Sequence, residues 1–194
     1  MAVLWLLFIS LTFYVLMTAR KPGRVLPASN TGLPVGAAFP QFAISSVSDK
    51  VPFATQHPKH NGTLVMFTSA HCPICNTVYP LIPLVEEKYR LKAQVIMEPL
   101  DEGNTESIMA KIHQMNITVP VFELTTSIRD AVKLEGFPFA YLLSQDGTVL
   151  SKGGINRLED FDLLIRQGRR ASFRIRKDSP GSVGSESGIP ANPA

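Results

Sequence analysis

The chain has 194 residues and only two cysteines, Cys72 and Cys75, which lie three positions apart. A disulfide stabilises a fold mainly by closing a long loop, and a bridge between these two residues closes almost none. Small scaffolds that depend on disulfides have more pairs at longer spacings. The pair is therefore better explained by chemistry than by stability. The fold must rest on an ordinary apolar core, which the 45% hydrophobic content allows.

A short apolar run ends just before the cysteines. Residues 63–67 are strand formers, and a polar stretch that includes His71 follows them. This pattern is typical of a buried central strand that ends at a functional loop. A helix is expected from position 72 to about 91. Pro73 suits its first turn, where a missing N–H costs nothing, and Pro80 is expected to kink it.

The predicted position of the two cysteines assigns them different roles. Cys72 would lie at a helix N-terminus, where free N–H groups and the helix dipole favour the thiolate, so it is the expected nucleophile. Cys75 would lie almost one turn further on, more buried, and would resolve the mixed disulfide. His71 either favours the thiolate through a protonated imidazole or is an exposed loop residue. Pro73 and Ile74 carry no charge from which a redox potential could be inferred.

The rest of the pattern alternates strands and helices, which predicts an α/β fold with a central mixed β-sheet flanked by helices. Asp146-Gly147 suits a tight turn between two strands. Strands are expected at residues 41–45, 94–98, 120–122, 139–143 and 148–151, and helices at 105–115, 127–134 and from Asn156 to about 167.

The N-terminal residues 2–19 contain no charged side chain. As a helix they would span about 27 Å, close to the thickness of a hydrocarbon core, so a transmembrane anchor is expected. A cleaved signal peptide is the main alternative, but no basic residue precedes the run and Thr18-Ala19-Arg20 is a poor cleavage site. A buried soluble helix is a weaker third interpretation. The Lys and Arg residues that follow the run favour a cytoplasmic domain.

Composition divides the rest of the chain into three parts. Residues 20–36 are rich in Pro and Gly and are expected to form a linker, and the folded domain is expected at 37–168. Residues 169–194 begin with basic residues and become rich in Ser, Gly and Pro from Lys177 onward, where a disordered tail is expected. The net charge of +3 is concentrated in two short basic stretches without interleaved aromatic residues, which argues against nucleic-acid binding.

Several separated blocks resemble the thioredoxin superfamily. Residues 64–67 leading into Cys72-Pro73-Ile74-Cys75 look like its strand and active-site loop, and Pro80 looks like its helix-kinking proline. The block around Phe137-Pro138, followed by Asp146-Gly147 and Gly153, looks like its cis-proline, hairpin and closing glycine. The resemblance implies a thioredoxin-like domain at 37–168, with a cis Phe137–Pro138 peptide opposite the cysteines. A substrate strand would pair with the backbone there.

The opening motif at residues 35–42 and the apolar N-terminus resemble the membrane-anchored TlpA/ResA branch, and most closely the MauD-type proteins of methylamine utilisation. This resemblance implies a thiol–disulfide oxidoreductase at the cell membrane with a periplasmic redox domain, against the charge distribution. It implies a protein disulfide or dithiol as partner, with the disulfide-rich small subunit of methylamine dehydrogenase as the candidate. His71 replaces the tryptophan that usually precedes the first cysteine, and no acidic residue stands between Cys75 and Pro80.

Two other functions stay open. A thiol peroxidase of the peroxiredoxin kind would need a proline, a Thr or Ser, and the cysteine at fixed spacing; Ser69 matches, but Val65 stands at the proline position. A copper- or cytochrome-assembly module would use both thiolates and a distant histidine, for which His113 is the candidate. A zinc site is disfavoured because no second C-x-x-C exists. No cofactor and no bound metal are expected for thiol–disulfide exchange.

Overall fold

The structure, a computed structural model, describes residues 5, 10–12 and 31–178 of the chain. One five-stranded sheet has the order β3-β2-β1-β4-β5. β1 and β2 are parallel, as are β2 and β3, whereas β4 runs antiparallel to both β1 and β5, which confirms the expected mixed sheet. The strands are β1 (Thr63–Ser69), β2 (Lys92–Glu98), β3 (Val121–Glu123), β4 (Phe139–Leu143) and β5 (Val149–Gly154).

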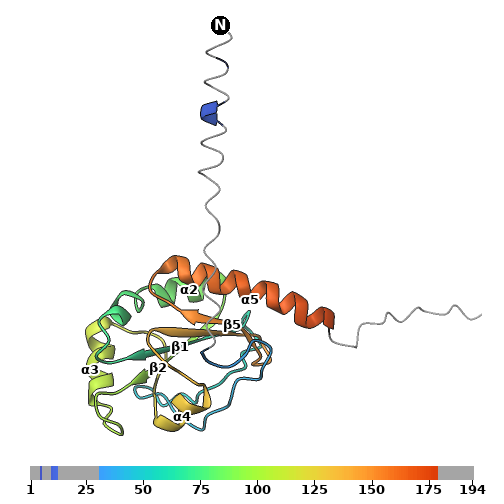
Figure 1. Cartoon of the computed structure of the whole chain (residues 1–194). Coiled ribbons are helices and arrows are strands. Elements are labelled where there is room, and N and C mark those ends of the chain that lie inside the picture. Colours follow the sequence, from blue (N-terminus) through green and yellow to red (C-terminus); the bar gives the residue numbers. More distant parts are fainter. Residues whose placement is uncertain (1–4, 6–9, 13–30, 179–194) are drawn as a thin grey trace, which may run out of the picture.

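Helices cover both faces of the sheet (Figure 1). Apolar residues of α2, α3 and α5 join one core cluster, and α4 contributes to the cluster on the other face. The sequence therefore predicted the layer arrangement correctly. The helices are the 3-10 helix η1 (Ile74–Thr77) and the α-helices α2 (Leu81–Tyr89), α3 (Glu106–Met115), α4 (Thr126–Ala131) and α5 (Leu158–Asp178).

Strand β1 is the centre of the molecule, and all seven of its residues are buried. It has a strand on each side, and its side chains alternate between the two cores: Leu64 and Met66 join one, and Val65 and Phe67 join the other. A strand buried on both faces reads as a continuous apolar run, which is why it could be recognised in the sequence. Its carboxyl end leads directly into the cysteine loop.

An aromatic cluster fills the core on the α4 side. Tyr141 contacts Phe39 and Phe67 edge to face, with ring centroids 5.3 Å and 5.9 Å apart, and Phe53 contacts Phe122 in the same way at 5.3 Å. The segment that supplies Phe39 and Phe53 is not the strand expected at residues 41–45. It forms only isolated bridges, because its apolar side chains pack against the sheet while its backbone passes over the face.

The last residues of the predicted linker are fastened to the domain. The Leu33 N–H donates to the Tyr141 hydroxyl at 3.0 Å, and the Lys152 ammonium donates to the Thr31 carbonyl at 2.6 Å. Burial raises the pKa of Tyr141 to about 12 and lowers the pKa of Lys152 from its ordinary value. The Tyr141 hydroxyl and the Lys152 side chain thus fix the backbone that enters the domain.

The helices differ from the predictions at three points. Helix α4 ends at Ala131, three residues before the end predicted at 134. The single kinked helix expected from 72 to about 91 is divided into η1 and α2, with Pro80 at the N-cap of α2. Pro80 has no N–H to continue the helical ladder and its ring would meet the preceding turn, so the helix breaks rather than bends. Helix α5 continues to Asp178, beyond the end expected near residue 167.

Of the predicted anchor at 2–19, only Trp5 and residues 10–12 are described, and they are helical. Among the described residues, no helix combines the length and apolar character needed to cross a membrane. Most of the anchor, residues 20–30 of the linker and the tail from 179 onward lie outside the described residues.

The half-buried His57 makes the stability of the domain depend on pH. Its Nε2 lies 3.1 Å from the Ala54 carbonyl, and burial lowers the pKa of the imidazole from its ordinary value of 6.5. The nearby His60 and Lys92 lower this pKa further, whereas Ala54 and Glu86 oppose the shift. Because the unfolded chain takes up the proton more readily, the contribution is fully present above about pH 6.5 and is lost as pH falls through the folded-state pKa.

We therefore expect wild-type protein to lose stability relative to His57→Gln between pH 7.5 and 5, measured by urea denaturation at each pH. His113→Gln is the matched control, because His113 is exposed on α3. Its stability should follow the wild-type curve. Parallel curves for wild type and His57→Gln would contradict the assignment.

Candidate active site

The two cysteines form a disulfide at the carboxyl end of β1. Their Cα atoms are 5.4 Å apart, within the usual range for a bridged pair. The Cys72 N–H donates to the Ser69 carbonyl at 3.2 Å, so the loop turns back as soon as the strand ends. Pro73 then caps η1 with the helical φ of −63° that its ring imposes. The local sequence thus places the bridge directly after the carboxyl end of β1.

The two sulfur-bearing residues differ in accessibility. Cys75 is 0% exposed and joins the core cluster that includes Val78 and Tyr79. Cys72 is half-buried and lies at the edge of the same cluster. Disulfide exchange requires a thiolate to approach along the S–S axis, so an external partner can reach the Cys72 sulfur but not the Cys75 sulfur. This geometry fits the predicted roles of attacking and resolving cysteine.

The backbone supplies a hydrogen-bond donor to the reacting sulfur. The Cys75 N–H lies 3.2 Å from Cys72 Sγ and would stabilise negative charge on that atom in the reduced state. The helix that follows is only the four-residue η1. The same N–H also lies 3.2 Å from the Cys72 carbonyl, so the sulfur shares this donor with the backbone of its own residue.

His71 is exposed, and its imidazole is held by Ser69 rather than by a cysteine. The Ser69 Oγ lies 3.1 Å from His71 Nδ1. The ring lines a pocket of about 290 Å³ together with Glu98, Glu102 and Arg129. The ring lies next to the cysteine loop, which fits an effect on the thiolate. Its hydrogen bond is made to Ser69 at the end of β1, which fits an exposed loop residue. Of the other modulating residues, Ile74 is 51% exposed beside the bridge.

The Phe137–Pro138 peptide is cis, as predicted. Pro138 immediately precedes β4, whose first residue Phe139 pairs with Phe67 of β1. The proline therefore lies at the same end of the sheet as the cysteine loop, where β1 ends and β4 begins. Phe137 is half-buried and packs against the core cluster that Cys75 joins. The cis peptide is thus confirmed, whereas the contact of these two residues with a substrate stays a prediction.

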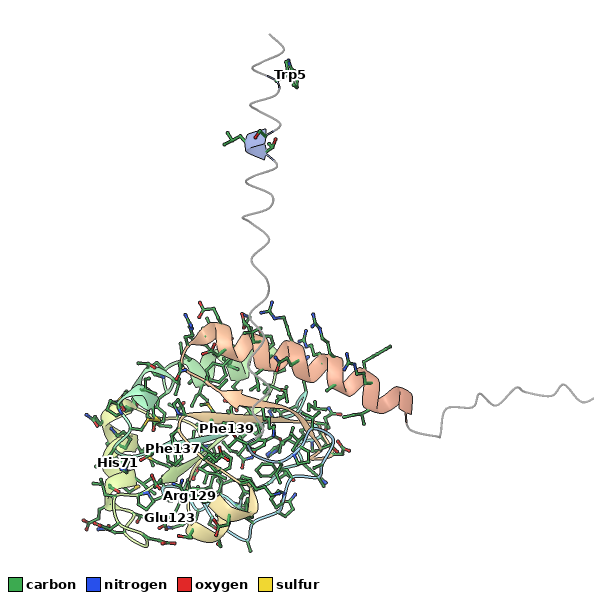
Figure 2. All side chains as sticks on the ribbon, in the orientation of Figure 1. Trp5, His71, Glu123, Arg129, Phe137 and Phe139 are labelled. Atoms are coloured by element: carbon green, nitrogen blue, oxygen red, sulfur yellow. A yellow bond between two sulfur atoms is a disulfide. The ribbon has the colours of Figure 1, made fainter. Side chains whose placement is uncertain are left out.

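An ion pair beside Phe137 escaped the sequence analysis. Arg129 of α4 pairs with Glu98 at the end of β2, and its guanidinium lies 5.1 Å from the centroid of the Phe137 ring. Figure 2 shows Arg129, Phe137 and His71 in the same part of the molecule, and Arg129 and His71 line the same pocket. Glu98 could have been found from the sequence. It is a charged residue at the end of a buried strand, and such residues mark the end of the sheet where functional loops lie. Arg129 could not have been found in this way, because α4 is far from β2 in the sequence.

The residues behind the alternative functions lie as follows. Val65, at the proline position of the peroxidase pattern, is buried within β1, and the Ser69 hydroxyl is engaged with His71. His113 lies on α3 and is exposed. Within residues 31–178 and the few described before them, no three His, Cys, Asp or Glu side chains are grouped closely enough to hold a metal ion.

The chain combines a C-x-x-C disulfide at the end of the central strand with a cis-proline before β4, on a mixed sheet of the thioredoxin-like fold. The thioredoxin domain of a thiol–disulfide oxidoreductase from Bacteroides vulgatus has the same fold, with a TM-score of 0.57 at 16% identity over 69% of this chain and 97% of that one. No protein-family model matches the chain.

In sequence, the chain is similar to the methylamine utilization protein MauD of several bacteria. MauD of Paracoccus versutus is 23% identical over 173 residues, 84% of each protein. MauD of Methylorubrum extorquens is 24% identical over 187 residues, 90% of this chain and 87% of the relative. The similarity extends over most of the chain, in agreement with the resemblance found in its motifs.

Proposed function

We propose that this protein is a membrane-anchored thiol–disulfide oxidoreductase that exchanges disulfides with a partner protein, and that the partner is methylamine dehydrogenase during its maturation. The observation that carries the exchange function is the Cys72–Cys75 bridge, in which Cys72 is half-buried and Cys75 is fully buried in the core. Similarity to MauD supports the methylamine context.

The exchange proceeds in two steps that conserve electrons. When the protein oxidises its partner, a partner thiolate attacks Cys72 Sγ, the intramolecular bridge breaks, and the electron pair leaves on Cys75. A second partner thiolate then attacks the partner sulfur of the mixed disulfide and releases Cys72 as a thiolate. The partner dithiol loses two electrons and the cysteine pair gains them. Reduction of a partner disulfide follows the same steps in reverse.

The membrane part of the proposal rests on the uncharged residues 2–19, and the periplasmic orientation rests on the resemblance to MauD-type proteins. The basic residues after the run favour the opposite orientation. After mild reduction, a membrane-impermeant maleimide added to intact spheroplasts should label Cys72. Labelling only after the cells are lysed would place the domain in the cytoplasm.

Cys75→Ser should trap the partner. Without the resolving thiol, the mixed disulfide at Cys72 cannot be released intramolecularly, so it should accumulate when the variant is expressed with methylamine dehydrogenase. Acid quenching, alkylation and mass spectrometry of the purified adduct should identify a cysteine of the small subunit bound to Cys72.

Cys72→Ser/Cys75→Ser is the control and should carry no adduct. Two outcomes distinguish the exchange function from the methylamine context. Adducts with other proteins but not with methylamine dehydrogenase would remove the methylamine context and keep the exchange function. No adduct with any protein would contradict exchange itself.

A further inference from the structure

We propose that the C-terminal half of α5 binds the surface of an anionic lipid bilayer. This inference goes beyond the redox function and does not use the cysteines. It rests on how α5 leaves the domain, on its charge, and on one exposed aromatic side chain.

Helix α5 has two halves with different surroundings. Phe161, Leu164 and Ile165 of the first half are buried against the sheet, and Gly168 is the last buried residue among those of the helix up to Ile175. A Cβ at Gly168 would lie 2.5 Å from the Leu142 side chain, which shows how closely the helix approaches the sheet there. Beyond this point the helix projects past the sheet (Figure 1). Its second half is therefore an accessible surface.

The projecting half carries a high density of positive charge. From Arg169 onward it has five basic residues, Arg169, Arg170, Arg174, Arg176 and Lys177, and one acidic residue, Asp178 at its end; Arg166 lies one turn earlier. Side chains are described as far as Ile175. Among these, none of the arginines of α5 forms a salt bridge with a carboxylate. Arg166 donates to the Asp162 carbonyl at 3.2 Å, and the Arg169 guanidinium lies 5.7 Å from the Tyr89 ring.

Phe173 lies within this basic surface and is 65% exposed. Because residues three and four apart share a helix face, its ring is adjacent to Arg170 and Arg169. A phenyl ring among guanidinium groups is poorly accommodated by water. At a bilayer surface the arginines can pair with lipid phosphates while the ring enters the boundary between headgroups and acyl chains.

The position of the domain in the chain favours a lipid over another polyanion. If residues 2–19 span a bilayer, the eleven residues at 20–30 extend at most about 40 Å. A domain of this size has a radius of gyration of about 15 Å, so its whole surface lies within reach of the lipid. The tether would raise the effective lipid concentration at α5. Single-stranded nucleic acid is usually bound on several aromatic platforms, whereas Phe173 is the one aromatic residue between Arg169 and Asp178.

The test uses a tryptophan reporter in the full chain, whose single native tryptophan is Trp5. Trp5→Phe/Phe173→Trp is reconstituted in nanodiscs of phosphatidylcholine alone or with 30% phosphatidylglycerol. We expect a blue-shifted emission and quenching by brominated lipid only with phosphatidylglycerol, both reversed by 0.5 M NaCl. Trp5→Phe/Leu84→Trp is the matched control, because Leu84 is 56% exposed on α2, and its emission should not depend on the lipid.

Adding Arg169→Gln, Arg170→Gln and Arg174→Gln to the reporter should reduce the quenching at least twofold, while exchange activity in detergent stays at the wild-type level. Equal emission in both lipids, or quenching that survives the three substitutions, would overturn the proposal. Tighter binding to an oligonucleotide than to anionic vesicles would also overturn it. The exchange activity, measured in parallel, shows separately whether the redox function stands.

Discussion

Cys72→Ser should lower the rate of disulfide exchange by at least about a thousandfold, because a serine hydroxyl is not ionised at neutral pH and cannot form a mixed disulfide. The partly exposed sulfur at position 72 is the one that an external partner can reach, since Cys75 is buried in the core. Insulin reduction in the presence of dithiothreitol measures the rate. The variant should still fold, because the bridge closes a very short loop.

Cys75→Ser is the informative comparison for this result. It should retain one round of attack through Cys72 and form a stable mixed disulfide, but it should not turn over. Peroxide consumption by the same proteins tests the peroxidase alternative. Exchange that survives the loss of Cys72 would contradict the assignment of the attacking sulfur.

Gly62→Ala should destabilise the domain by about 3 kcal/mol, combining an unfavourable backbone conformation with steric overlap. Gly62 has a φ of +139°, and a Cβ there would lie 2.2 Å from the carbonyl oxygen of Leu143. Its own carbonyl accepts from the Lys92 N–H at 3.0 Å. The residue thus sits between the start of β2 and the end of β4, where backbone cannot move without disturbing the central strand. Urea denaturation measures the effect.

Gly103→Ala is the matched control for this substitution. Gly103 also has a positive φ of +83°, but a Cβ there meets nothing within 4 Å. Gly103→Ala should lower the free energy of unfolding by about 1 kcal/mol, which is the cost of the backbone conformation alone. Equal losses of stability in the two variants would show that the contact with Leu143 is not responsible.

The sequence was most informative where one local pattern decides the structure. The buried run that became β1, the C-x-x-C motif and the Asp-Gly turn before β5 each depend on near neighbours in the chain. The cis Phe137–Pro138 peptide was placed by resemblance to a family, since an isolated X–Pro dipeptide carries no such information.

Contacts between distant segments were not predictable in the same way. The Arg129–Glu98 pair joins residues 31 positions apart, and Arg129 reaches Phe137 only because α4 packs beside the turn before β4. The segment containing Phe39 and Phe53 has strand-like composition but packs as an aromatic layer. The break at Pro80 also depended on context, because a proline can either kink or end a helix.

The rate at which each cysteine of the reduced protein is alkylated tests the central claim most directly. The protein is reduced, treated briefly with limiting iodoacetamide at pH 7, and digested, and modification of each cysteine is quantified by mass spectrometry. We expect Cys72 to be modified at least about tenfold faster than Cys75, because thiol reactivity follows access and thiolate character. Cys75 should react only after the protein is unfolded in urea. Equal rates, or faster modification of Cys75 in the folded protein, would contradict the assignment of an exposed attacking sulfur and a buried resolving one.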